Sequence, residues 1–142
     1  MNDLIARLGS VSEGSRELDA RITVTLQLKP EWLRGCDRDL VLVPPDPRFA
    51  PFSTYTVAAG RYGPSVEIAH YTTSLDAALT LVPEGMEWHV SNRGQIGAHR
   101  LCFASIYGPP MVGSECDANA ATPALALCVA SLKARQHKSE AA

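Results

Sequence analysis

A central stretch of the chain, residues 68–107, combines one helix pattern with two strand patterns. Thr73 is a suitable helix cap, and residues 83–85 end the helix pattern. Between them, the apolar residues that share one helical stripe are Leu75, Ala78, Leu79 and Val82. Apolar and polar residues then alternate from Met86 to Ser91, and a second alternating run begins after Gln95. These patterns predict a helix followed by an antiparallel hairpin.

The charges of the hairpin suggest a register. A two-residue turn at residues 93–94 sets Trp88 opposite His99 and Glu87 opposite Arg100, and it sets Ser91 opposite Ile96. This register predicts an apolar face made of Met86, Trp88, Val90, Leu101 and Phe103. It predicts a mixed face made of Glu87, His89, Arg100 and Cys102. A further helix or a partner chain is the expected cover of the mixed face.

Amphipathic helices are predicted on both sides of this stretch. A short helix begins at Asn2 or Asp3, and a longer one begins at Ser12 or Ser15. Thr122 and Pro123 begin a closing helix, because Thr is a good N-cap and Pro is tolerated at the first helical position. Residues 108–121 read as a connection, and residues 136–142 as a frayed tail. The pattern therefore predicts helices packed on an antiparallel sheet.

Prolines interrupt the segment from about residue 29 to residue 65, in which only residues 40–43 and 55–58 read as short strands. The aromatic residues of this segment argue against full disorder: Trp32, Phe49, Phe52 and Tyr55. They either anchor the loop to the body of the protein or line a ligand cleft, and anchoring is the favoured interpretation. We expect a single domain over residues 1–142 with this segment as an insertion.

Composition narrows the classes of partner. The chain has 142 residues and a formal net charge of -2, so no global field recruits nucleic acid or an acidic membrane. No apolar run is long enough to span a bilayer, and the N-terminus lacks the apolar core of a secretory signal. We expect a cytoplasmic protein. The four cysteines form no C-x-x-C pair and are expected to be reduced: Cys36, Cys102, Cys116 and Cys128.

No residue set forms a recognisable catalytic or metal site. Cys102 or Cys116 beside His89 or His99 would be needed for a nucleophile and its base, but packing and surface roles explain these residues better. Adding Asp117 to these groups gives no spacing that organises a metal site. We therefore expect no catalytic residue, no metal and no cofactor.

Two groups of residues are candidates for binding an anion. Tyr71 directly precedes the predicted helix start, where backbone N–H groups can receive an anion, although it also suits a hydrophobic staple. Asn92, Arg93, His99 and Arg100 gather at the hairpin end, where arginines are able to grip phosphates. A solvated hairpin tip explains the second group equally well, so both interpretations stay open.

Three stretches resemble the phage ABA sandwich domain family of small phage and prophage proteins. They are GSRELDARI, HYTTSLDAALTLV and ATPALALCVASLKA, which together span most of residues 13–135. The resemblance implies an α+β fold, a three-layer α-β-α sandwich with a mainly antiparallel sheet flanked by amphipathic helices. A further similarity is to the first-described type of Thoeris anti-defence proteins, which sequester cyclic ADP-ribose isomers without cutting them.

That similarity implies a binding site built from aromatic stacking and from arginines on the pyrophosphate. Carried onto this sequence, it assigns stacking to Tyr71, Trp88 and Phe103, the base edge to Asn92, and phosphate to Arg93, His99 and Arg100. One departure concerns the closing helix, in which the family often has a basic residue after its Cys, whereas Val129 follows Cys128 here. A phosphate contact from this helix is therefore in doubt.

We therefore expect a non-enzymatic phage counter-defence protein that sequesters a small cyclic nucleotide, with no nucleic acid or membrane partner. A homo-oligomer is expected, because a pocket between subunits encloses a ligand that a small monomer only half buries. One alternative is a structural or protein-interaction module without a small-molecule ligand. Another is a phosphodiesterase that degrades the same signal.

Overall fold

The computed structural model describes residues 1–33, 35–49, 54–60, 63–96, 99–108 and 116–141, with backbone alone at 92–96, 99–101 and 139–141. The described chain is an α+β protein with two three-stranded antiparallel sheets, so the predicted fold class is confirmed. It divides into two compact units, Met1–Gly14 with His70–Ala142, and Ser15–Ala69. The predicted insertion at residues 29–65 falls inside the second unit.

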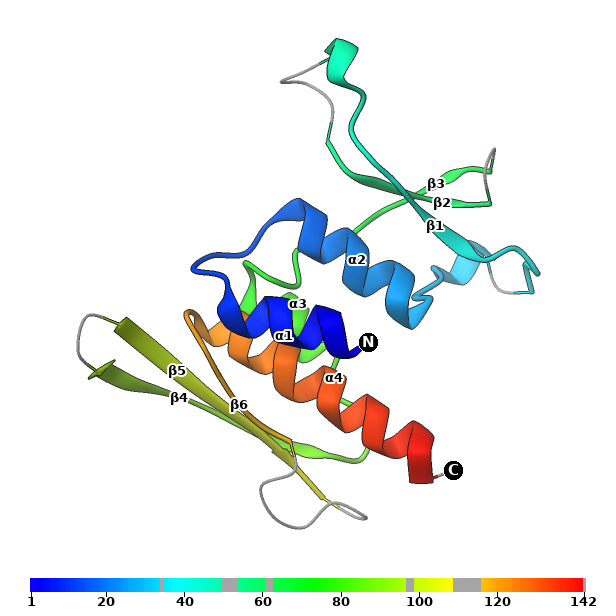
Figure 1. The fold of residues 1–142 in the computed structure, drawn as a ribbon. Helices are drawn as coiled ribbons and strands as arrows, with labels where there is room; N and C mark the ends of the chain where they lie inside the picture. Colours follow the sequence, from blue (N-terminus) through cyan, green and yellow to red (C-terminus); the bar gives the residue numbers. More distant parts are fainter. Residues whose placement is uncertain (34, 50–53, 61–62, 97–98, 109–115, 142) are drawn as a thin grey trace. The chain divides into compact units, whose positions relative to one another are not determined.

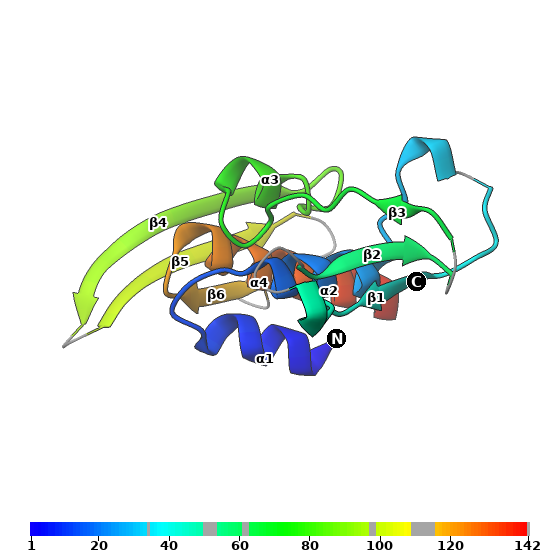
Figure 2. The same cartoon turned by 90° about the horizontal axis from the view of Figure 1, so that it is seen from above.

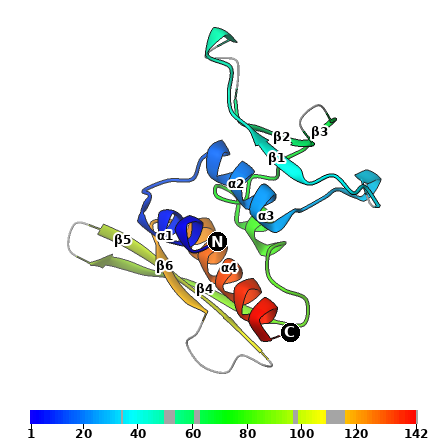
Figure 3. The same ribbon diagram turned by 45° about the vertical axis from the view of Figure 1, so that its right-hand side comes forward.

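The larger unit packs its helices around α4 on the sheet β4-β5-β6. α4 contacts all three strands, while α1 packs on α4 and β6, and α3 packs on α4 (Figures 1 and 3). The elements are α1 (Asn2–Ser10), α3 (Leu75–Leu79), β4 (Glu87–Ile96), β5 (His99–Tyr107), β6 (Asp117–Ala120) and α4 (Pro123–Ala141).

Small residues on one face of this sheet allow the helices to approach closely. Cross-strand pairing sets Cys102 beside Ala120, and Ala104 beside Ala118, and all four are buried. Ile106 continues this face and is also buried. Above it, residues 124–132 of α4 are buried throughout, because the helix has neighbours on more than one side. The core of the larger unit therefore lies between α4 and this face.

The predicted hairpin exists, but its predicted register is wrong. β4 continues through residues 93–94 to Ile96, which pairs with His99, and Trp88 pairs with Ile106 instead of His99. Glu87 pairs with Tyr107 instead of Arg100. Two residues of β4 stand opposite one residue of β5 between Asn92 and Gln95, and this extra residue shifts the register. A turn placed at residues 93–94 was therefore too early.

The corrected register also changes the two faces. Trp88 and Val90 share the helix-facing side with Cys102, whereas Phe103 lies on the opposite side with His89. Trp88 and Phe103 therefore do not form one apolar face, contrary to the prediction. The side that carries Phe103 also carries Glu87, Ser105, Tyr107, Asp117 and Asn119.

α4 begins where the sequence predicts. The Thr122 Oγ1 accepts the Leu125 N–H at 3.2 Å, and Pro123 is the first helical residue. Near the other end, the Arg135 Nε donates to the Leu81 carbonyl at 2.8 Å and the Lys133 Nζ donates to the Asp117 carbonyl at 2.9 Å. The helix continues to Ala141, past the start of the predicted frayed tail.

The smaller unit packs α2 against the sheet β1-β2-β3. Its core cluster contains Ala20, Leu33, Leu40, Val57, Ala59, Val66 and Ile68. The elements are α2 (Arg16–Leu26), the 3₁₀ turns η1 (Glu31–Leu33) and η2 (Pro47–Phe49), β1 (Leu40–Val43), β2 (Thr56–Ala59) and β3 (Ser65–Val66). Short strands are stable here because β1 and β2 pack on α2, and β3 pairs with β2.

Side chains that bond to backbone hold this small sheet to its helix. Gln27 ends α2 at a φ of 50°, and its side-chain amide accepts the Leu40 N–H at 2.7 Å and donates to the Leu40 carbonyl at 3.0 Å. The Arg16 guanidinium bonds the buried Asp19 carboxylate at 2.9 Å and the Ile68 carbonyl at 2.8 Å. Arg16, the first residue of α2, thus bonds to Ile68, close to the point where the chain leaves the smaller unit.

One of the four aromatic residues of this segment packs on the core of the smaller unit, to which the segment itself belongs, so anchoring to the rest of the protein stays a prediction. Tyr55 packs on the core cluster. Trp32 and Phe49 are each 62% exposed, so they do not anchor the segment. Phe52 lies outside the described residues.

Two strands and one cap differ from the sequence prediction. Ser74, not Thr73, caps α3, since its hydroxyl accepts the Ala77 N–H at 3.3 Å. β6 lies in the stretch that was read as a connection, and β3 is also new. β6 has the sequence DANA, which lacks the β-branched residues typical of strands.

Candidate functional site

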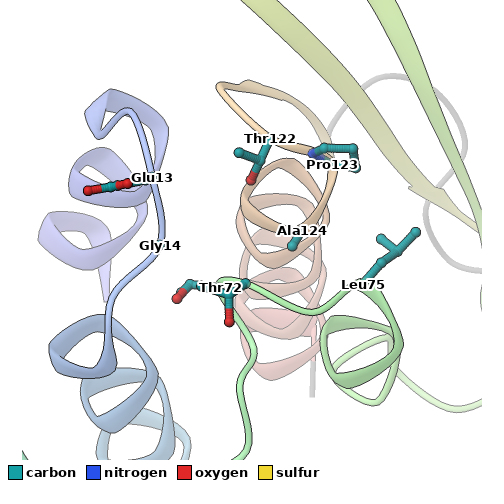
Figure 4. A pocket seen from close by; sticks show the side chains of 8 residues that line it. Glu13, Gly14, Thr72, Leu75, Thr122, Pro123 and Ala124 are labelled. Atoms are coloured by element: carbon teal, nitrogen blue, oxygen red, sulfur yellow. The ribbon is translucent and has the colours of Figure 1, made fainter.

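A cleft of about 340 Å³ lies in the larger unit, where the turn before α3 meets the N-terminus of α4 (Figure 4). It is lined by Glu13, Gly14, Thr72, Thr73, Leu75, Thr122, Pro123 and Ala124. These residues come from three segments that are distant in sequence. Small-molecule sites have volumes of about 300–1,000 Å³, so this cleft is at the small end of that range.

One wall of the cleft requires a glycine. A Cβ at Gly14 would collide with the backbone carbonyl and the hydroxyl of Thr72. The absence of a side chain therefore lets residues 12–15 approach the Thr72 turn. In Figure 4, the Glu13 side chain extends away from Thr72 and Thr122, so its carboxylate does not fill the cleft.

The opposite wall is the first turn of α4. Pro123 has no N–H, the Leu125 N–H donates to the Thr122 hydroxyl, and the Ala126 N–H donates to the Thr122 carbonyl at 2.9 Å. Ala124 lines the cleft with an N–H that has no acceptor within the helix. The positive end of a 19-residue helix and threonine hydroxyls thus border a mainly apolar cleft. Such a lining suits a flat organic group that carries a hydrogen-bond acceptor or an anion.

The three aromatic residues proposed for stacking lie in different places. Tyr71 is buried, and its carbonyl accepts the Cys128 thiol at 3.1 Å. Trp88 is 46% exposed and lies on the helix-facing side of the sheet. Phe103 is half-buried on the other side, 6.5 Å from the His89 ring centre. These three rings therefore do not surround one ligand within a subunit, although Tyr71 directly precedes the cleft residue Thr72.

The four polar residues proposed for the base and phosphates are described by their backbone alone. Asn92 and Arg93 lie in β4, and His99 and Arg100 lie in β5. Their side chains lie outside the described structure, so a phosphate site at the hairpin end stays a prediction.

Those residues considered for nucleophilic or metal chemistry whose side chains the structure describes do not form a catalytic or metal site, and the His99 side chain lies outside the described structure. His89 lies on the opposite side of the sheet from Cys102. The Ser105 hydroxyl donates to the Asp117 carboxylate at 2.6 Å, and His89 pairs with Ser105 on the neighbouring strand. Ser105 thus stands between His89 and Asp117, whereas a serine triad needs the histidine in the middle. Within the described residues, no three His, Cys, Asp or Glu side chains gather as metal ligands.

Sequence reasoning missed the threonines of the cleft. Thr72 and Thr122 are 50 positions apart in sequence, so no local spacing relates them. The one available signal was that each stretch, T-T-S and T-P, reads as a helix start. Two helix starts in one unit gave no reason to expect them side by side.

Comparisons with family models, curated proteins and solved structures give no match. Among the helices of the described chain, none combines the length and hydrophobicity that spanning a bilayer requires.

Proposed function

We propose that this protein is a phage counter-defence protein that binds and sequesters a cyclic nucleotide immune signal, a cyclic ADP-ribose isomer, without cleaving it. The observation that carries the proposal is the cleft at the start of α4, which offers hydroxyls, a backbone N–H and apolar surface together. The similarity to the first-described type of Thoeris anti-defence proteins supplies the class of ligand.

The physical fit has three parts. A base or ribose packs on the apolar lining that Leu75 and Pro123 provide. The Thr73 and Thr122 hydroxyls serve as hydrogen-bond partners, and the positive end of α4 favours a phosphate. Sequestration asks these groups only to bind the ligand, so the proposal assigns them no chemical step.

One subunit encloses only part of such a ligand. The cleft is open to solvent and small, and a sequestering protein must bind at low free ligand concentration. A second surface is therefore required, and a homo-oligomer supplies it. The hairpin residues Asn92, Arg93, His99 and Arg100 are candidates for contributing phosphate contacts from that surface.

The test compares two substitutions at two places. Thr73 is exposed and lines the cleft, so Thr73→Trp fills the cleft without disturbing the core. Thr80→Trp is the matched control, since Thr80 is also exposed but lies at the other end of α3. We expect binding of a cyclic ADP-ribose isomer, measured by calorimetry, to be lost with Thr73→Trp and kept with Thr80→Trp.

Arg100→Ala separates the cleft from the hairpin. Loss of binding in Arg100→Ala with retention in Thr73→Trp would assign the site to the hairpin end. No binding of cyclic ADP-ribose isomers or cyclic di- and trinucleotides by the unmodified chain would overturn the proposed function. Release of altered ligand would favour the phosphodiesterase alternative.

A specific observation favours a second candidate, a protein-interaction module. Trp32 and Phe49 are large apolar residues that each stay 62% exposed in the smaller unit. Exposed aromatics at such levels are common at protein-binding surfaces. This candidate predicts that the unmodified chain binds no small cyclic nucleotide, and that Trp32→Ala and Phe49→Ala leave folding unchanged but abolish binding of a protein partner.

A further inference from the structure

The two edges of the larger sheet differ in how they are protected. β6 is four residues long, and its Asp117 carbonyl is occupied by the Lys133 Nζ at 2.9 Å. α1 packs against the same strand, and a Cβ on Gly9 would lie 4.0 Å from the Asn119 carbonyl oxygen. Helices and a lysine thus keep another strand from pairing with β6.

Among the described residues, no helix or lysine protects the outer edge of β4 in this way. β4 has ten residues and pairs with β5 alone among the described strands, with β5 between it and β6 (Figure 2). The register is regular from Glu87 to Asn92, and Arg93 and Gly94 then stand opposite the single residue Leu101. No proline or lysine interrupts β4. A regular strand therefore presents an unpaired row of N–H and C=O groups that ends at a bulge.

An exposed aromatic residue accompanies this open edge. Trp88 is 46% exposed, although it lies on the helix-facing side together with Ile106. Its neighbour on the same side, Val90, is half-buried. A strand added beside β4 would cover apolar surface here as well as satisfy backbone groups.

We propose that two copies of this chain pair through β4 as antiparallel strands, about a two-fold axis at Val90. In this register Glu87 of each copy stands opposite Arg93 of the other, Trp88 opposite Asn92, and His89 opposite Ser91. The pairing therefore contains two opposite-charge pairs. β4 is self-complementary in this register.

The neighbouring registers lack this complementarity. An axis at Ser91 sets His89 at the register position opposite Arg93, which gives no opposite-charge pair, and an axis at His89 leaves Glu87 opposite Ser91. An axis at a residue also keeps the side chains of both copies on matching faces, so both sets of helices stay on one side of a continuous sheet. Charge thus selects the axis at Val90.

The assembly closes at two copies. Each copy uses the β4 edge of its larger sheet, and the protected β6 edges remain at the outside of the joined sheet, so a filament does not grow through this sheet. Because the seam is short, the interface is at the small end of specific interfaces, and a dissociation constant on the order of 10 µM is expected.

The test is a charge swap read by sedimentation of the full chain without ligand. Glu87→Arg and Arg93→Glu each bring like charges together twice, and each should weaken dimerisation about ten- to a hundredfold. The double variant, with both substitutions, restores both pairs in the opposite sense and should recover the dimer. Glu67→Arg is the matched control for Glu87→Arg, since Glu67 is exposed in the other unit and its reversal changes the net charge in the same direction and by the same amount.

Three results would overturn the proposal. They are a monomer at every concentration up to about 1 mM, a dimer that both single variants leave unchanged, and a double variant that stays monomeric while its thermal stability equals that of the unmodified chain. If the β4 edge pairs with an extended peptide of another protein instead of a second copy, the purified chain will stay monomeric at every concentration. The measurement uses no ligand, so its outcome does not depend on the proposed function.

Discussion

The two sheets of this protein share strand order and antiparallel pairing but differ in what stabilises them. The strands of the larger unit have ten, nine and four residues and pack under a 19-residue helix. Those of the smaller unit have four, four and two residues and pack on an 11-residue helix. Side chains bond to the backbone of both sheets, from Lys133 in the first and from Gln27 in the second, but the second sheet, with its shorter strands and shorter helix, depends on such bonds more. Similar topology therefore rests on different interactions.

Truncating one buried leucine in each unit should give the largest effects. Leu127 in α4 is completely buried, and Leu127→Ala should lower the free energy of unfolding by about 4 kcal/mol. Leu40→Ala in β1 should cost about 2–3 kcal/mol, because a small sheet collapses more readily around the gap. Urea unfolding followed by segment-resolved hydrogen exchange measures both values.

This comparison fails if Leu40→Ala costs as much as Leu127→Ala. Equal costs would mean that the smaller core is packed as rigidly as the larger one. The bonds from the Gln27 and Arg16 side chains to the backbone would then contribute little to the stability of the smaller unit.

Removing a tether of the smaller unit should have the next largest effect. Arg16→Ala leaves the Asp19 carboxylate, which is completely buried, without its guanidinium, and it also removes the bond to Ile68. Because the Arg16 side chain is 35% exposed, we expect a loss of about 2 kcal/mol, which is less than for a fully buried pair.

Arg21→Ala is the control for this substitution, since the Arg21–Glu17 pair lies on the same helix but is more exposed. Its removal should cost about 0.3–0.5 kcal/mol. The denaturant midpoints of the two variants measure this difference. Equal small losses of unfolding free energy would show that the bonds of Arg16 to Asp19 and Ile68 contribute little to stability.

A substitution in α4 should increase stability. The Ser131 hydroxyl is completely buried and has no hydrogen-bond partner among the described residues. Ser131→Ala removes an unsatisfied polar atom and should raise the free energy of unfolding by about 1 kcal/mol. Thr23→Val is the contrast, because the Thr23 hydroxyl donates to the Asp19 carbonyl at 3.0 Å and its removal should destabilise. A loss of stability in Ser131→Ala would contradict this account of the helix.

The smallest effect is expected at an exposed pair in the smaller unit. Arg48 bonds the Asp46 carboxylate and lowers the pKa of that carboxyl below its ordinary value. A lowered pKa in the folded state contributes stability above the ordinary pKa, and this contribution is lost as the pH falls. Because this pair lies at the surface, where solvent screens it and the Arg48 side chain is 81% exposed, Asp46→Asn should leave the thermal midpoint at pH 7 unchanged. A clear fall in that midpoint would show that the Arg48–Asp46 pair stabilises the smaller unit.

Local patterns predicted the elements of the larger unit better than their pairing. Thr122 and Pro123 define the start of α4 by cap chemistry, which is local, so this prediction is confirmed. The hairpin register depends on an extra residue of β4 between Asn92 and Gln95, and no local sequence signal marks that extra residue. β6 forms because β5 offers an edge, not because DANA favours strand.

The candidate site was less predictable than the fold. Residues chosen for chemistry, such as Trp88 and Phe103, fell on opposite sides of the sheet once the register changed. The cleft at Thr72 and Thr122 arises from tertiary packing of two helix starts and from the close approach of Gly14. Because the two helix starts are distant in sequence, the spacing of residues along the chain does not predict that they pack together.

The most direct test of the central claim is calorimetric titration of the unmodified chain with a cyclic ADP-ribose isomer, followed by heating of the complex and analysis of the released ligand. We predict saturable binding and recovery of intact ligand. Ligand at about a hundredfold its dissociation constant should also stabilise the fold by about 2.7 kcal/mol. Absence of binding, or recovery of a cleaved product, would contradict the account.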